Sequence, residues 1–66
     1  MKKLDAIDVK ILNILQKDAR IPLKDLAAKV FLSSPSVSAR LEKLEEEGII
    51  LGYHAQINPM MMNYHI

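Results

Sequence analysis

Four serines and two basic residues lie within eleven positions of this chain, in the stretch SSPSVSARLEK that spans residues 33 to 43. Hydroxyl and cationic groups are the donors that proteins use to bind phosphates and the edges of nucleotide bases. Ser33 is a suitable helix N-cap, and Pro35 fits the first turn, where its missing N–H costs nothing. The N-terminus of a helix also carries the positive end of its dipole. This end of the predicted helix is therefore suited to an anion.

The other end of the same helix has the opposite character. Four glutamates lie between residues 42 and 47, and Gly48 is suited to end the helix with a positive φ angle. Val37, Leu41 and Leu44 recur at helical spacing and form the stripe that should be buried. Because acid repels phosphate, we expect this end of the helix to point away from an anionic partner.

A long first helix is predicted within LDAIDVKILNILQKD, residues 4 to 18. Asp5 is its N-cap, and Asp8 is a weak capping-box partner. Its apolar residues follow the i, i+4, i+7 and i+8 spacing of one helix face, namely Ile7, Ile11, Ile14 and Leu15. This helix should supply one side of a small core.

The second helix should begin at or just after Pro22, because proline disfavours helix at the residue before it. Its apolar stripe runs from Leu23 to Val30, and only Phe31 and Leu32 separate it from Ser33. Two amphipathic helices joined by so tight a turn are typical of the helix-turn-helix motif. In this motif the second helix of the pair enters the major groove of DNA. The predicted contacts with double-stranded DNA are Ser33, Ser34, Pro35, Ser36, Ser38, Ala39, Arg40 and Lys43.

A second interpretation is open for one of the two basic residues in this set. Arg40 and Lys43 are the expected cationic contacts with DNA, but Arg40 could instead tie the third helix to a nearby Asp or Glu.

The whole motif could also serve as a protein-interaction or dimerisation module that does not bind DNA. Such a module would show apolar residues at positions 36, 39, 40 and 43. Those positions hold serine, alanine, arginine and lysine, which favours DNA.

The pattern changes after Gly48. The stretch IILGYHAQI, residues 49 to 57, is β-prone, and within it Tyr53, Ala55 and Ile57 alternate with the polar His54 and Gln56, which predicts a β-strand. The predicted fold is mainly α: a three-helix, winged-helix-like helix-turn-helix domain over residues 1–52, then a short β-strand linker within residues 53–66. An unpaired strand invites pairing with another chain. We therefore predict a two-fold homodimer whose interface uses Val9, Leu12, Tyr53, Ala55 and Ile57.

Composition narrows the class of protein. A chain of 66 residues is one domain at most, and half of its residues are hydrophobic, which is typical of a globular protein. Cysteine is absent, which excludes disulfides. No apolar run approaches the roughly 18 residues of a membrane span. Acidic residues lie near the start of the chain, where an export signal would have an apolar stretch. We expect a cytoplasmic protein without a membrane partner. Charge is polarised, with net +4 through Arg40 and −3 afterwards.

Catalytic and metal chemistry find little support in the sequence. His54 and His65 are the only histidines and have no partner cysteine, so no metal site is predicted. No Gly-rich loop or nucleophile motif is present, so we predict that the chain is not an enzyme.

The order of short phrases along the chain resembles the N-terminal domain of the Lrp/AsnC family, the feast/famine transcriptional regulators of bacteria and archaea. The shared phrases, from Leu4 to Pro59, are LDAIDVKIL, LQKDARI, LAAKV, LS, ARLEKLEEEGII, GY and NP. The resemblance implies a helix-turn-helix over about residues 23–42 and sequence-specific DNA binding. It also implies a following α/β domain, outside this chain, that binds an amino-acid effector and drives assembly into dimers and octamers. The tail MMMNYHI resembles the entry to that domain's first strand, so the chain looks like a fragment, and no cofactor is expected within it.

One position departs from the family pattern. Phe31 stands in the turn where the family usually has glycine. A positive φ angle at phenylalanine costs on the order of 1 kcal/mol. Two outcomes are therefore open: the turn has another shape, or Phe31 is strained but packed.

Overall fold

The first helix begins at a pair of aspartates. In the computed structural model, which describes residues 4–55 and 57–62, α1 spans Ala6–Lys17 and has Asp5 as its N-cap. The Asp5 carboxylate accepts a 2.8 Å hydrogen bond from the Asp8 backbone N–H, and the Asp5 backbone N–H donates to the Asp8 carboxylate at 3.3 Å. This capping box satisfies N–H groups that have no partner inside the helix. The predicted start of the first helix is confirmed.

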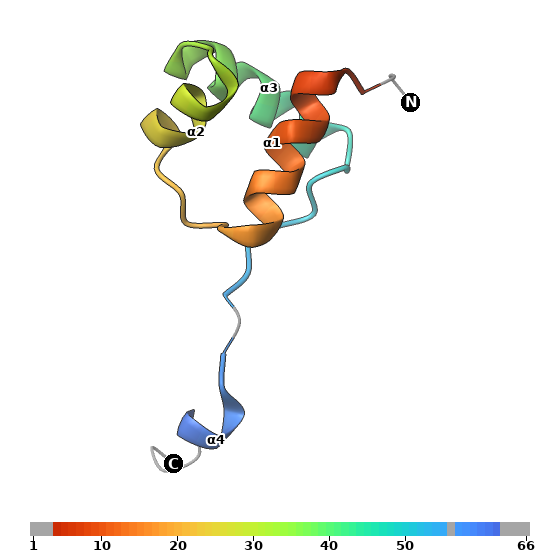
Figure 1. The fold of residues 1–66 in the computed structure, drawn as a ribbon. Coiled ribbons are helices and arrows are strands. Elements are labelled where there is room, and N and C mark those ends of the chain that lie inside the picture. Colours follow the sequence, from red (N-terminus) through yellow and green to blue (C-terminus); the bar gives the residue numbers. More distant parts are fainter. Residues whose placement is uncertain (1–3, 56, 63–66) are drawn as a thin grey trace.

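The next two helices form the helix-turn-helix pair. α2 spans Leu23–Val30 with Pro22 as its N-cap, and α3 spans Ser34–Glu46 with Ser33 as its N-cap. Both starts agree with the sequence prediction. Figure 1 shows α2 beside the start of α3, whose later turns pass behind α1 in this view.

Phe31 makes the sharp turn between α2 and α3. Its φ of 59° and ψ of 41° are left-handed, and the N–H groups of Phe31 and Leu32 donate to the carbonyl oxygens of Ala28 and Ala27 at 3.3 and 3.0 Å. The turn therefore has the shape that glycine would favour, with phenylalanine in its place. The ring is not packed in the core, because 86% of the residue is exposed. The Nζ of Lys10 lies 5.5 Å from the ring centroid, within the range of a cation–π contact.

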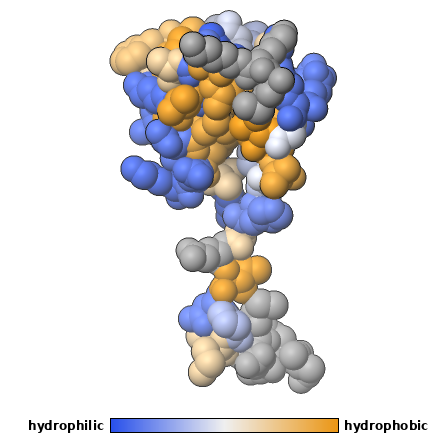
Figure 2. All heavy atoms as spheres, turned by 90° about the vertical axis from the view of Figure 1, so that its right-hand side faces the viewer, coloured by the Kyte–Doolittle hydropathy of each residue, from blue (hydrophilic) through white to orange (hydrophobic). Residues whose placement is uncertain are grey.

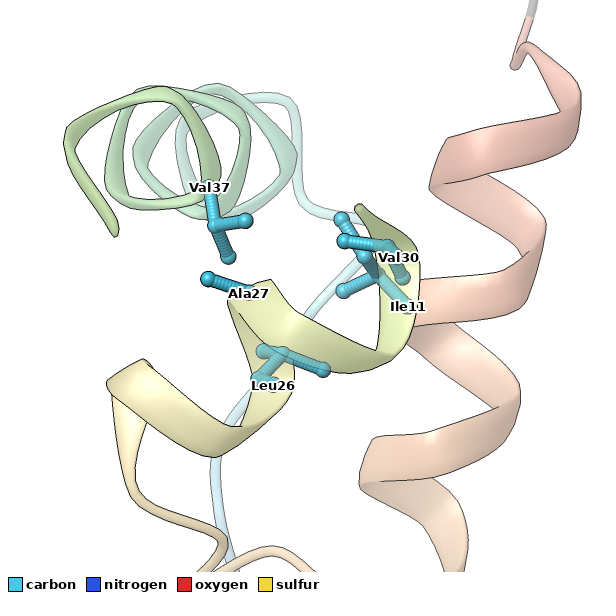
Figure 3. Close-up of a cluster of buried hydrophobic side chains, with 5 residues drawn as sticks. All are labelled: Ile11, Leu26, Ala27, Val30 and Val37. Carbon is cyan, nitrogen blue, oxygen red and sulfur yellow. The ribbon is translucent and has the colours of Figure 1, made fainter. Parts of the chain in front are cut away.

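The core is built where the three helices meet. Figure 3 shows its buried side chains pointing toward one another from all three helices: Ile11, Leu26, Ala27, Val30 and Val37. Half-buried residues of the predicted stripes surround this cluster, among them Ile7, Ile14, Leu15 and Leu41. Leu23 departs from the prediction: it is exposed, because it is the first residue of α2 and lies beyond the edge of the core. α1 packs on α2, and α2 packs on α3.

The predicted β-strand linker is not confirmed. α3 ends before Gly48, which has the predicted positive φ of 76°, and the N–H groups of Ile49 and Ile50 donate to the Leu44 carbonyl oxygen. The described residues contain no strand; residues 51–55 and 57–58 have no regular secondary structure. A strand takes its backbone hydrogen bonds from a neighbouring strand, and the part of the chain that the structure describes offers none to this segment.

The chain then leaves the three-helix domain and ends its described part in a short helix (Figure 1). This helix, α4, spans Pro59–Met62, and the Asn58 side chain accepts a 2.9 Å hydrogen bond from the Met60 N–H. All three methionines of the tail are thus helical, where the resemblance predicted the entry to a strand. Residues 63–66 lie outside the described part, as does Gln56.

Candidate nucleic-acid interface

The N-terminus of α3 is organised by two of the predicted serines. Ser33 Oγ accepts a 3.3 Å hydrogen bond from the Ser36 N–H and donates to Ser36 Oγ at 2.9 Å. The Ser33 hydroxyl therefore serves the cap, while the Ser36 hydroxyl accepts that bond and keeps its own hydrogen to donate elsewhere. Pro35 occupies the first turn beside them and is exposed. These contacts explain why α3 starts at this point.

The remaining small residues of the set face outward. Ser38 and Ala39 are exposed, and Ser34 is half-buried. Among the described residues, no side-chain hydrogen bond uses the hydroxyl of Ser34 or Ser38. Lys43 is exposed one turn after Ala39, and the acidic end of the helix follows. The exposed residues of α3 therefore present hydroxyl and methyl groups along its first half, and the Lys43 ammonium group in its last turn, next to the exposed Glu42.

Arg40 has a different environment from its neighbours on α3. Its Nη1 donates to both carboxylate oxygens of Asp5, at 2.8 and 2.7 Å, and to Asp8 Oδ1 at 2.9 Å. The side chains of Arg40 and Asp8 are 30% and 17% exposed, so this pair is partly shielded from water. The tie to an aspartate that the sequence left as an alternative for Arg40 is thus present. The hydrogen bond from Arg40, followed by that from the Asp8 N–H, lowers the pKa of Asp5. The hydrogen bonds that Arg40 donates to the carboxylates of Asp5 and then Asp8 raise the pKa of Arg40.

This ion-pair network borders a cleft between α1 and α3. The cleft has a volume of about 410 Å³, and Lys43, Leu44 and Glu47 line it together with the three charged residues of the network. In the sequence, Asp5 and Asp8 indicated only the start of a helix. No local signal could have joined them to Arg40, which lies more than 30 positions away.

The predicted dimer residues are only partly brought together. Leu12, Tyr53 and Ala55 line one groove of about 1040 Å³ between α1 and the segment after α3, whereas Val9 and Ile57 lie outside it and are exposed. Figure 2 shows apolar side chains on one face of the domain and again in the segment that leaves it. Tyr53 is also held to α3, because its hydroxyl donates a 2.7 Å hydrogen bond to Glu45 Oε2.

Two further findings, on metal binding and membrane insertion, concern all the described residues together. They contain no group of three or more His, Cys, Asp or Glu side chains that could hold a metal ion. Their helices are also too short and too polar for any of them to cross a bilayer. His65 lies outside the described part of the chain.

Comparison with known proteins identifies the family. A family model described as winged helix-turn-helix DNA-binding matches residues 4–50. The chain therefore belongs to the winged helix-turn-helix DNA-binding family.

Individual relatives confirm the resemblance to Lrp/AsnC regulators. The chain is 47% identical over 62 residues to the leucine-responsive regulatory protein of Haemophilus influenzae, covering 94% of this chain and 37% of that protein. It is 46% identical over 61 residues to the transcriptional regulator LrpA of Pyrococcus horikoshii, covering 92% of this chain and 43% of that protein. The chain thus spans about two fifths of the length of these relatives.

Solved structures agree with these relatives. LrpC of Bacillus subtilis matches with a TM-score of 0.83 at 39% identity, over 92% of this chain and 44% of that one. An AsnC family transcriptional regulator from Agrobacterium tumefaciens matches with a TM-score of 0.83 at 42% identity, over 91% and 39%. A Neisseria meningitidis transcriptional regulator in complex with L-Met matches with a TM-score of 0.85 at 38% identity, over 92% and 40%.

Proposed function

We propose that this chain binds double-stranded DNA sequence-specifically, as the DNA-binding part of a cytoplasmic transcriptional regulator, with α3 in the major groove. The observation that carries this proposal is the exposed face of α3, which follows a tight turn and offers hydroxyl and methyl groups in its first half and the ammonium group of Lys43 in its last turn. Membership of a winged helix-turn-helix DNA-binding family supports it. The proposed contacts are Ser34, Pro35, Ser36, Ser38, Ala39 and Lys43, with Ser33 as the cap.

The chemistry of these side chains suggests how they divide the work. The serine hydroxyls donate to phosphates or to base acceptors, and the Ala39 methyl suits the methyl group of thymine. Lys43 supplies a point charge for a phosphate. Binding of this kind needs no catalytic group, so we assign the chain no enzymatic activity.

Salt dependence tests the proposal directly. One short helix neutralises few phosphates, so a single copy should bind duplexes weakly, with an affinity that falls steeply from low to physiological salt. Fluorescence anisotropy with labelled duplexes, chosen by selection from a random pool, measures both affinity and sequence preference. Binding that ignores salt would support the protein-interaction alternative instead.

A pair of matched variants locates the contact on α3. Lys43→Gln should reduce the slope of log affinity against log salt by about one, because one phosphate contact is lost. Lys17→Gln removes the same charge from the last turn of α1 and should leave the slope almost unchanged. Equal losses in both variants would argue for attraction by net charge alone.

The working unit that we propose is a two-fold dimer. One recognition helix reads only a few base pairs, so useful specificity needs two half-sites about one helical turn apart. The exposed Val9 and Ile57, with the groove at Leu12, Tyr53 and Ala55, offer apolar surface for a second copy. In that dimer, residues 53–57 would acquire the strand pairing that one copy lacks. Sedimentation over a wide concentration range tests this; a monomer at the highest concentration would place dimerisation outside this chain.

The division of the chain follows from the same reasoning. We assign DNA binding to residues 1–52 and a linking role to residues 53–66, which would lead to an effector domain. A homologous regulator was solved in complex with L-Met. An amino-acid effector is therefore proposed for the longer parent protein and not for this chain. Accordingly, L-Met should leave duplex binding by these 66 residues unchanged, whereas the parent should respond to its own amino acid.

A further inference from the structure

Arg40 concentrates three hydrogen bonds on a single nitrogen. Nη1 lies 2.7–2.9 Å from three carboxylate oxygens of Asp5 and Asp8. These are the two ion pairs found among the residues that the structure describes, and both join α1 to α3. Charge-assisted hydrogen bonds of this length are stronger than neutral ones.

The same two carboxylates hold the first turn of α1. Asp5 accepts from the Asp8 N–H, and Asp8 accepts from the Asp5 N–H. Close helix packing in this domain runs from α1 to α2 and from α2 to α3. The network therefore adds a direct contact between the start of α1 and the middle of α3. Without it, these two helices are connected mainly by their packing on α2.

We infer that Asp5 and Asp8 are positioning residues of the DNA interface: by holding Arg40 in a tie between α1 and α3 they fix the orientation in which α3 binds DNA, and Arg40 acts through this tie without contacting a phosphate. The inference rests on the proposed DNA binding. To reach a phosphate, Arg40 would have to leave two carboxylates, one of them only 17% exposed. Both would then stand unpaired beside an anionic duplex, and both their desolvation and their repulsion from DNA oppose that exchange.

Salt dependence separates a positioning arginine from one that touches DNA. Arg40→Gln should weaken duplex binding about tenfold, since coupled residues that share a network lose interactions of this size. Its slope of log affinity against log salt should match that of the unmodified chain, whereas Lys43→Gln lowers the slope by about one. A slope lowered by about one in Arg40→Gln would overturn the inference.

Removing the charges of Asp5 and Asp8 while keeping Arg40 also separates a positioning arginine from one that contacts DNA. The double variant Asp5→Asn, Asp8→Asn keeps side chains that can cap α1 but removes the charges that hold Arg40. We expect weaker duplex binding at an unchanged slope. Tighter binding with a steeper slope would mean that the freed Arg40 reaches DNA, and would also overturn the inference.

A measurement on the unmodified chain covers the case in which a variant unfolds. Side-chain NMR during duplex addition should leave the Arg40 guanidinium signal in place while the Lys43 signal moves. Movement of the Arg40 signal by as much as that of Lys43 contradicts the positioning role. Duplex binding by the unmodified chain is measured before any variant is compared. If it shows no salt-dependent binding at all, the proposed function itself fails.

Discussion

The hydroxyl of Tyr53 donates a 2.7 Å hydrogen bond to Glu45 Oε2 and so fastens the segment after the domain to the last turns of α3. Burial, together with this hydrogen bond and the Glu45 charge, raises the pKa of Tyr53 to about 12. The contact is short in sequence, eight positions, but it needs the reversal at Gly48 to form. It ties the path of the linker to the helix that we propose enters DNA.

Removing the Glu45 charge should return Tyr53 toward the ordinary tyrosine pKa of 10.0. The folded pKa lies above the unfolded one, so the stability from this contact is complete below pH 10.0 and is lost as pH rises through about 12. Tyrosinate absorbance in a Tyr64→Phe background isolates the titration of Tyr53. Glu45→Gln should lower its midpoint, and Glu46→Gln should not. Equal midpoints in all three chains would show that the contact is absent in solution.

Acid should weaken the tie between α1 and α3. The pKa of Asp5 is lowered from 3.8, so its contribution is present above 3.8 and is lost as pH falls through the folded value. Urea unfolding between neutral and acidic pH should show this loss, and Asp5→Asn should remove part of it. Asp25→Asn, an exposed carboxylate of α2, is the control. An acid response unchanged in Asp5→Asn contradicts the prediction.

The strained turn can be relieved at one position. Phe31→Gly should be more stable than Phe31→Ala by about 1 kcal/mol, because only glycine escapes the Cβ clash of the left-handed conformation. Both variants lose the ring near Lys10, so their difference isolates the backbone term. Thermal or urea unfolding measures it. Equal stabilities would mean that Phe31 leaves the left-handed region in solution.

The small core should be sensitive to a single methylene. Ile11 is fully buried among side chains of α2 and α3, so Ile11→Val should cost about 1 kcal/mol of unfolding free energy. Val9→Ala removes more atoms from a residue that is 44% exposed on the same helix, and should cost less. Urea unfolding ranks the two. The opposite order would place Val9 in a buried interface with another copy.

Local sequence determined the helices and their ends. Asp5, Pro22, Ser33 and Gly48 act within one turn of the chain, where capping hydrogen bonds, fixed proline φ and glycine freedom decide the start or end of a helix. Apolar spacing likewise predicted which face of each helix is buried, because a helical period is itself a local property. These features identified a helix-turn-helix before any tertiary contact was known.

Tertiary structure alone decided what the charged and aromatic side chains do. Arg40 and Lys43 look alike in sequence, yet Arg40 is paired with the start of α1 and Lys43 is exposed, because only the folded chain brings Asp5 and Asp8 to one of them. The alternation in residues 53–57 predicted a strand, but a strand also needs a neighbouring strand, and the described residues 4–55 and 57–62 provide none. Local signals determine the elements, whereas pairing across more than 30 residues depends on how those elements pack.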